Sequence, residues 1–186
     1  MQPLRQLLGA LKQLATPQAC LFTPADLRAV LPQLSDVAFN TLLSRAVSSG
    51  HLQRVCRGLY RYDTYPSNLP FSLSQAATKL RPMDLNYLSL ETVLSDAGVI
   101  SQIPINRIMV MSSGRSNVID CNSWGSIEFV HTRQTPDSLV EHLHYDPQNK
   151  MWRASVKQAL RDMKATHRST DLIDWSVTNE LMQQNV

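Results

Sequence analysis

The sequence SDVAFNTLLSRAVSSGHLQRVCRGLYRY, residues 35–62, decides the predicted fold of the N-terminal part of the chain. Ser35 and Asp36 can cap the start of a helix, and Gly50 stands where helices commonly end. Two short runs on either side of the turn residues 56–58 then predict a β-hairpin. The helix is expected to bury the apolar residues that recur at helical spacing, which are Phe39, Leu42, Leu43, Ala46 and Val47.

Two more helices are predicted before this stretch. Leucines at helical spacing give residues 2–15 one apolar face. The sequence Thr23-Pro24-Ala25-Asp26 provides a capping hydroxyl, a proline at the first helical position and a carboxylate near the first free amides. Pro32 ends this second helix. Three helices followed by a hairpin within about 60 residues are the order of a winged helix-turn-helix, in which the hairpin is the wing.

Positive charge is concentrated in this part of the chain. Residues 1–65 hold seven basic and three acidic side chains, a net charge of +4, whereas the rest of the 186-residue chain has a net charge of −1. Such asymmetry favours a nucleic-acid surface at one end. The composition is typical of soluble globular proteins. No stretch approaches the roughly 20 apolar residues of a membrane span, and the N-terminus lacks signal-peptide features. We therefore expect a cytoplasmic protein with no membrane partner.

The polar face of the third predicted helix is suited to double-stranded DNA. It carries short hydrogen-bonding side chains and one arginine, namely Asn40, Thr41, Ser44, Arg45 and Ser48. With no carboxylate after Asp36, this face can enter a major groove and contact base edges and phosphates. The wing adds arginines suited to phosphate contact or minor-groove insertion, namely Arg54, Arg57 and Arg61. Alternatively, a winged helix can serve as a protein-docking or dimerisation module, and a polar helix face can simply be solvated.

Residues 64–70 contain two prolines and no periodicity, which predicts a linker. We therefore expect an α+β protein with a winged helix-turn-helix domain of residues 1–65 and a second domain of residues 66–186. In the second domain the pattern predicts a mixture of helices and antiparallel strands. The helices are expected at residues 72–80, 88–97, 137–144, 152–166 and 170–182, and the strands at 105–111, 117–121 and 126–131.

A second candidate basic face lies in the helix predicted at residues 152–166. Its members are spaced to share one side of that helix and its extension, and they are Arg153, Lys157, Arg161, Lys164 and Arg168. Trp152 is expected on the apolar side of the same helix. The basic face can be a solvated surface paired with neighbouring aspartates, or it can contact the DNA backbone or an acidic partner.

Two segments of the chain resemble a known family. Residues 50–61, GHLQRVCRGLYR, resemble the wing of AbiEi-family antitoxins from bacterial type IV toxin–antitoxin (abortive infection) systems. Residues 87–99, YLSLETVLSDAGV, are similar to the helix that opens the C-terminal domain of that family. Residues 153–160 followed by residues 172–174 are a looser match.

The resemblance implies a DNA-binding antitoxin. Its winged helix would bind repeats in its own promoter and repress its own operon, as a monomer or weak dimer that binds DNA cooperatively. Its C-terminal domain would antagonise a nucleotidyltransferase-like toxin, with which it need not form a stable complex. The alternative function is a winged-helix transcriptional regulator whose C-terminal domain senses a ligand or dimerises, with no toxin partner.

No motif indicates an enzyme, and we expect no catalytic residues, metal or cofactor. Residues 141–146, EHLHYD, place two histidines near two carboxylates. On a helix, His142 and His144 would point about 200° apart; on a strand they would share a face, with His131 as a third ligand. Residues 112–116, SSGRS, lack the spacing of a phosphate-binding loop and are expected to form a turn.

The three cysteines lie far apart in the sequence, at Cys20, Cys56 and Cys121. Their number and spacing favour reduced thiols over a disulfide or a metal site. We expect Cys121, at the end of a strand, to be buried and Cys56, in the wing turn, to be more exposed.

Overall fold

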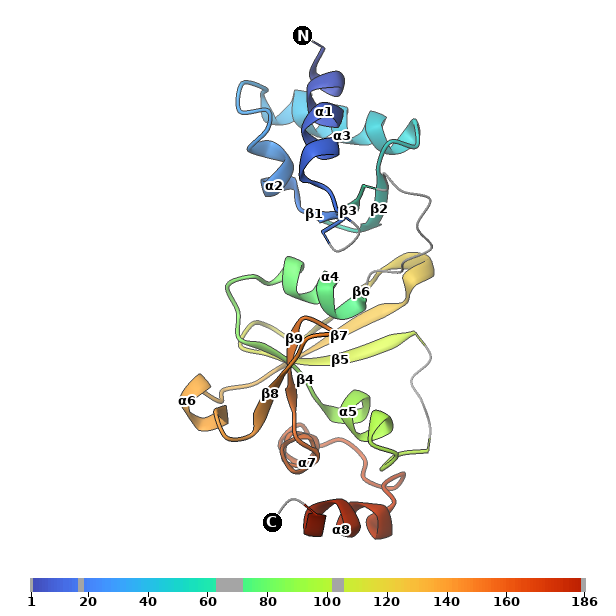
Figure 1. Cartoon of the computed structure of the whole chain (residues 1–186), viewed down its shortest axis with the longest axis vertical. Coiled ribbons are helices and arrows are strands. Elements are labelled where there is room, and N and C mark those ends of the chain that lie inside the picture. Colours follow the sequence, from blue (N-terminus) through green and yellow to red (C-terminus); the bar gives the residue numbers. More distant parts are fainter. Residues whose placement is uncertain (1, 17–18, 63–71, 102–105, 185–186) are drawn as a thin grey trace. The chain divides into compact units, whose positions relative to one another are not determined.

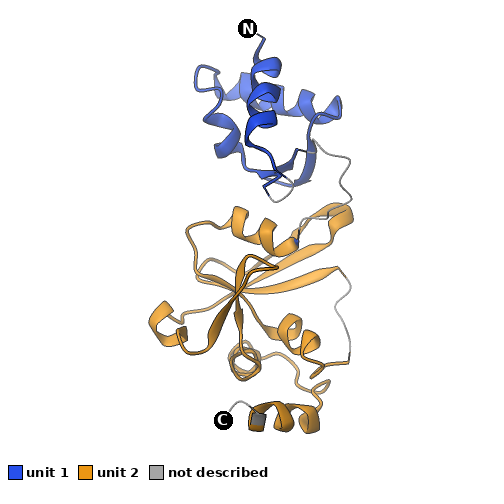
Figure 2. Cartoon of the chain, viewed as in Figure 1, with its two compact units in different colours: residues 1–72 blue, residues 73–186 orange. Residues whose placement is uncertain are grey.

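The computed structural model describes residues 2–16, 19–62, 72–101 and 106–184, and it has an α+β fold. The chain divides into two compact units, Met1–Ser72 and Leu73–Val186 (Figure 2). The predicted linker and the predicted boundary after residue 65 fall on residues 63–71, which lie outside the described residues. Within the described ranges, no helix is long and apolar enough to cross a membrane.

The N-terminal unit combines three helices with a small antiparallel sheet (Figure 1). In chain order its elements are α1 (Pro3–Leu14), β1 (Leu21–Phe22), α2 (Pro24–Arg28), α3 (Asp36–Ser48), β2 (Gln53–Cys56) and β3 (Leu59–Arg61). The strands lie in the order β1-β3-β2. The three helices and the hairpin agree with the predicted elements, whereas the two-residue strand β1 was not predicted.

The predicted caps of α2 and α3 are confirmed. Thr23 and Asp26 form a reciprocal capping box, because the Asp26 amide donates to Thr23 Oγ1 at 3.2 Å and the Thr23 amide donates to Asp26 Oδ2 at 2.8 Å. The Ala38 amide donates to Ser35 Oγ at 3.3 Å. Each side chain satisfies an amide that the first helical turn leaves free. Both helix starts are therefore fixed by local sequence.

The predicted apolar side of α3 forms part of the core. Phe39, Leu43 and Ala46 are buried, and Leu42 and Val47 pack against the same cluster while remaining partly accessible. The other residues of this cluster come from α1, β1, α2 and the segments that flank the helices and strands, and include Leu7, Leu11, Phe22, Leu27 and Leu31. Burial on one side leaves the opposite face of α3 open to solvent.

The C-terminal unit contains a six-stranded mixed sheet in the order β6-β7-β5-β4-β9-β8. Its strands are β4 (Asn86–Leu88), β5 (Arg107–Ser112), β6 (Asn117–Asp120), β7 (Ser126–His131), β8 (Leu143–Asp146) and β9 (Met151–Ala154). Two neighbouring pairs, β4–β9 and β5–β7, are parallel, and the other pairs are antiparallel. The expectation of antiparallel strands is therefore only partly correct.

Helices cover both faces of this sheet. Figure 1 shows α4 (Leu73–Leu80) on one face and α5 (Leu90–Asp96) and α7 (Val156–Ala165) on the other. The remaining elements are a 3-10 turn η1 (Asn122–Trp124), α6 (Pro136–Leu139) and α8 (Trp175–Gln184), which packs against α7. Arg81, just after α4, anchors it to the sheet: its guanidinium lies 3.9 Å from the centre of the Phe129 ring and donates to Ser112 Oγ at 2.9 Å.

Four predicted helices of this unit are wrong in part, and the last of them, expected at residues 170–182, begins only at Trp175. Residues 151–154 form strand β9, and Leu88 ends strand β4. The helix expected at residues 137–144 stops at Leu139, and β8 begins at Leu143. Residues 151–154 form a strand because their backbone pairs with both β4 and β8. This pairing outweighs the helical spacing of the side chains. Helix α7 begins only after Ser155, whose Oγ accepts a hydrogen bond from the Gln158 amide at 3.2 Å.

Candidate nucleic-acid interface

The polar residues predicted for DNA contact share the exposed face of α3. Asn40, Thr41, Ser44, Arg45 and Ser48 are all exposed. Sequence reasoning missed one neighbour on the N-terminal turn, Val37, whose exposed fraction is 78%. This apolar side chain does not contribute to the core of the unit. In a major groove its methyl groups would be suited to contact the methyl group of a thymine.

The hydroxyl groups on this face have an unexpected orientation. Thr41 Oγ1 donates to the Val37 carbonyl at 2.8 Å, Ser44 Oγ donates to the Asn40 carbonyl at 3.0 Å, and Ser48 Oγ donates to the Ser44 carbonyl at 3.0 Å. A hydroxyl has one proton, so each of these groups offers only its lone pairs to a partner. Facing a major groove, such acceptors match the amino groups of adenine and cytosine.

The only carboxylate on α3 is paired within the unit. Arg28 of α2 donates to Asp36 Oδ1 at 3.1 Å, and the Arg28 guanidinium lies 5.1 Å from the centre of the Phe39 ring. The ion pair joins the end of α2 to the start of α3 and compensates the negative charge of Asp36. The remainder of the exposed face is neutral apart from Arg45.

The β2–β3 hairpin places two of its three arginines at the surface. Arg57 and Gly58 form the turn, where Gly58 has a φ of 84°, a conformation that favours glycine. Arg54 on β2 and Arg57 are exposed. Arg61 is only 9% exposed, so its predicted place on the wing surface is wrong. The unpredicted strand β1 explains the error, because it makes β3 the central strand of the sheet instead of an edge.

The prediction for the cysteines is half correct. Cys121 is buried, as expected, but Cys56 is buried too. Side chains of a regular strand alternate between its two faces, so Cys56 would be exposed like Arg54. The register of β2 shifts between these two residues, however. This β-bulge allows both Val55 and Cys56 to face inward.

The second candidate basic face does not exist as one surface. Arg153 lies on β9 and pairs with Asp96 at 2.9 Å. Arg168 lies beyond the end of α7 and pairs with Glu91 at 2.7 Å and with Glu128. The other three residues, Lys157, Arg161 and Lys164, are exposed on α7. The prediction failed because it placed Arg153 and Arg168 on the same helix as the other three, whereas α7 begins after Arg153 and ends before Arg168.

The environment of Arg168 shows that this residue is structural. Burial lowers the pKa of its guanidinium, but the hydrogen bond and charge of Glu91, followed by the charge of Glu128, outweigh this effect and raise the pKa. Arg107 also lies near Glu128, at 3.7 Å. Arg168 thus joins α5 to β7 and is not available to an outside partner.

A buried carboxylate lies between the sheet and α7. Asp162 is fully buried and accepts hydrogen bonds from Ser89 Oγ at 2.6 Å, Gln134 Nε2 at 2.9 Å and Gln158 Nε2 at 2.8 Å. The Tyr87 hydroxyl lies 3.4 Å from Asp162 Oδ1. Burial raises the pKa of Asp162, and the hydrogen bonds partly offset it. Burial and then the charge of Asp162 raise the pKa of Tyr87.

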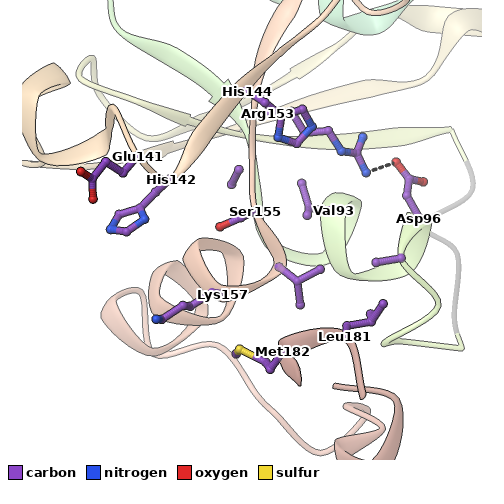
Figure 3. A pocket seen from close by; sticks show the side chains of 13 residues that line it. Val93, Asp96, Glu141, His142, His144, Arg153, Ser155, Lys157, Leu181 and Met182 are labelled. Carbon is purple, nitrogen blue, oxygen red and sulfur yellow. Dashed lines mark hydrogen bonds and ion pairs between the residues drawn. The ribbon is translucent and has the colours of Figure 1, made fainter. Parts of the chain in front are cut away.

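The two histidines of the EHLHYD segment line a cavity of about 620 Å³ in the C-terminal unit (Figure 3). His144 lies on β8, and His142 precedes that strand. The lining mixes charges of both signs, and its Arg153 and Asp96 are paired with each other (Figure 3). His131 does not line this cavity. Among the described residues, no group of three or more histidine, cysteine, aspartate or glutamate side chains could hold a metal ion.

No protein-family model matches the chain, and no curated protein sequence matches it significantly.

Proposed function

We propose that the N-terminal unit is a winged helix-turn-helix that binds double-stranded DNA in the protein's own promoter and represses its own operon. The observation that carries this proposal is the exposed face of α3, which is polar and whose only carboxylate, Asp36, is ion-paired. The element order α1-β1-α2-α3-β2-β3, with the sheet order β1-β3-β2, supports it. Exposed Arg54 and Arg57 add phosphate-binding groups on the neighbouring hairpin.

For the whole chain, we propose a type IV antitoxin of the AbiEi family that acts as a monomer or weak dimer. The support is the resemblance of residues 50–61 and 87–99 to that family. In this proposal the C-terminal unit antagonises a nucleotidyltransferase-like toxin without catalysing a reaction. A transcriptional regulator with a ligand-sensing C-terminal unit is the second candidate, and it is favoured by the cavities of that unit.

Fluorescence anisotropy with two labelled DNA fragments tests DNA binding. One fragment comes from the region upstream of the gene, and the other has the same length and composition in shuffled order. We expect tighter binding to the upstream fragment, with an affinity that falls steeply with salt, because each neutralised phosphate contributes about −0.9 to the slope of log K against log salt. Equal affinity for both fragments would contradict autorepression.

Variants separate the hairpin from α3. Arg57→Ala should weaken binding to both fragments and make the salt slope shallower by about one phosphate contact. Arg115→Ala is the matched control, since it removes an equally exposed arginine from the other unit. Asn40→Ala and Ser44→Ala should instead change which sequences bind best. If all three N-terminal variants lose affinity equally on every sequence, this division of roles is wrong.

Co-expression with the adjacent gene tests the antitoxin proposal. A nucleotidyltransferase-like protein encoded next to this chain should arrest growth alone, and co-expression of the full chain should relieve the arrest. The double variant Arg54→Ala/Arg57→Ala should lose DNA binding but still relieve arrest, because both substitutions lie in the N-terminal unit. If the double variant loses both DNA binding and the relief of growth arrest, antagonism depends on the N-terminal unit, and its assignment to the C-terminal unit is wrong.

A further inference from the structure

A second cavity of the C-terminal unit, of about 610 Å³, differs from the first in its charge. One side of the cavity is formed by the end of β7 and the residues that follow it, and the other side by the C-terminal half of α7. Its ionisable lining residues are all basic, and they are His131, Arg133 and Arg161. Its apolar lining residues are Met111, which is buried, and Ala165, which is exposed. The volume falls in the range typical of small-molecule sites, and the charge favours an anion.

Among the residues that the structure describes, neither arginine of this cavity has a carboxylate partner. In the same unit Arg107, Arg153 and Arg168 each form an ion pair with an acidic side chain. Arg133 and Arg161 are exposed, and within the described part of the chain neither forms an ion pair. Their positive charge therefore remains uncompensated, unlike that of the arginines that hold the fold together.

Arg161 contacts a histidine instead of a carboxylate. Its Nη1 lies 3.0 Å from His142 Nε2. A guanidinium has no lone pair to offer, so in a hydrogen bond between these atoms Arg161 is the donor. Because an imidazole carries no negative charge, the contact does not compensate the positive charge of Arg161. The contact thus limits the freedom of Arg161 without reducing its attraction for an anion.

The buried carboxylate network fixes the backbone beneath both arginines. Arg133 directly precedes Gln134, and Arg161 directly precedes Asp162, while Gln134 Nε2 donates to Asp162 Oδ1 at 2.9 Å. The Gln134 amide also donates to Thr132 Oγ1 at 3.2 Å. These bonds hold the two segments together, so the two cationic side chains start from fixed positions on one cavity. Such preorganisation lowers the entropy that binding costs.

We propose that this cavity binds a small organic phosphate of nucleotide size through Arg133 and Arg161. Guanidinium groups match phosphate oxygens in charge and can donate two parallel hydrogen bonds to them. The cavity volume of about 610 Å³ accommodates the larger body of such a ligand, whereas inorganic phosphate would fill only a small part of it. This inference concerns the C-terminal unit alone and does not depend on DNA binding by α3.

Isothermal titration calorimetry of the full chain with AMP, ATP, inorganic phosphate and a short DNA duplex tests the proposal. Saturable binding of AMP or ATP at least tenfold tighter than inorganic phosphate is the expected result. Equal affinity for inorganic phosphate would reduce the site to an unspecific anion site and overturn the proposed ligand class. Competition of the duplex with AMP would assign the cavity to the DNA backbone instead, and absence of any binding at millimolar concentrations would overturn the site.

Variants identify the cavity as the place of binding. Arg133→Gln and Arg161→Gln should each weaken nucleotide binding at least tenfold, and Arg133→Lys should weaken it less, because lysine keeps the charge but loses the forked geometry. Lys157→Gln is the matched control, since Lys157 is exposed on the same helix but outside this cavity. Among the described residues the Arg133 side chain forms no ion pair, and it is exposed, so we expect Arg133→Gln to fold. An Arg133→Gln protein that folds and binds nucleotide normally would refute the proposal.

Discussion

Substitution of the buried Asp162 should distinguish its hydrogen bonds from its charge. Asp162→Ala leaves the donors of Ser89, Gln134 and Gln158 without their acceptor in a site that water does not reach. Each buried donor left unsatisfied costs about 1–3 kcal/mol. Partial relaxation reduces the sum, so we expect the free energy of unfolding of the C-terminal unit to fall by about 3–5 kcal/mol.

Asp162→Asn should cost much less near neutral pH. The asparagine oxygen can still accept from Gln134 and Gln158, and its amide group can donate to Ser89 Oγ if that hydroxyl rotates. The substitution also removes the cost of burying a negative charge. We therefore expect a loss of about 1 kcal/mol or less, which would show that the acceptor geometry of Asp162 matters more than its charge.

The difference between wild type and Asp162→Asn should depend on pH. Burial raises the pKa of Asp162 in the folded chain above its ordinary value of 3.8. The folded state therefore binds this proton more tightly than the unfolded state. The resulting stability is fully present below pH 3.8 and is lost as the pH rises through the raised pKa. Acidification from neutral pH should thus stabilise the wild type relative to the asparagine variant.

Urea denaturation followed by tryptophan fluorescence measures these effects in the right unit. All three tryptophans, Trp124, Trp152 and Trp175, belong to the C-terminal unit. Their transition therefore reports the unfolding of that unit and not of the N-terminal unit. A loss below about 1 kcal/mol for Asp162→Ala, or a difference between wild type and Asp162→Asn that stays constant from pH 4 to pH 8, would refute the reasoning.

Three further outcomes are expected in the N-terminal unit. If α3 enters a major groove, Val37→Ala should lower the affinity for thymine-containing promoter DNA roughly 15-fold, because it removes two methylene equivalents at about 0.8 kcal/mol each. Anisotropy should show no such loss on the same fragment made with uracil. Thr23→Ala should lower the free energy of unfolding by about 1 kcal/mol through loss of the capping box, and Thr23→Ser should not. Gly58→Ala should lower the free energy of unfolding by about 1 kcal/mol, measured by circular dichroism, because alanine is strained at a φ of 84°. The strain lies in the backbone alone, since no atom lies within 4 Å of the position that the added Cβ would take.

Features set by residues close together in the chain could be predicted from the sequence. The caps at Thr23 and Ser35 and the buried face of α3 depend on spacings of three or four residues, and each is present. The exposed polar residues of α3 follow from the same periodicity. Strong local signals therefore define most of the N-terminal unit and the position of its candidate interface.

Features set by distant partners could not be predicted. Strand β1 has only two residues and exists because it pairs with β3, about 40 residues later. The helical spacing around Trp152 is accidental, since β4 and β8 supply the backbone partners that make this segment a strand. The same applies to Arg168, because nothing near it in the sequence indicates that Glu91 will neutralise it. From the sequence alone, the five basic residues from Arg153 to Arg168 therefore have the spacing of a single helix face.

The orientation of the hydroxyl groups on α3 has a thermodynamic consequence for docking. Thr41, Ser44 and Ser48 are already held by carbonyls of their own helix, so their rotamers are restricted before any partner arrives. Binding therefore costs less side-chain entropy than it would for long, freely rotating side chains. Release of water from this surface also breaks no bond donated by these hydroxyls to solvent. We expect the heat capacity and enthalpy of association with DNA to be dominated by the arginines and by the DNA, with the helix itself acting as a rigid template.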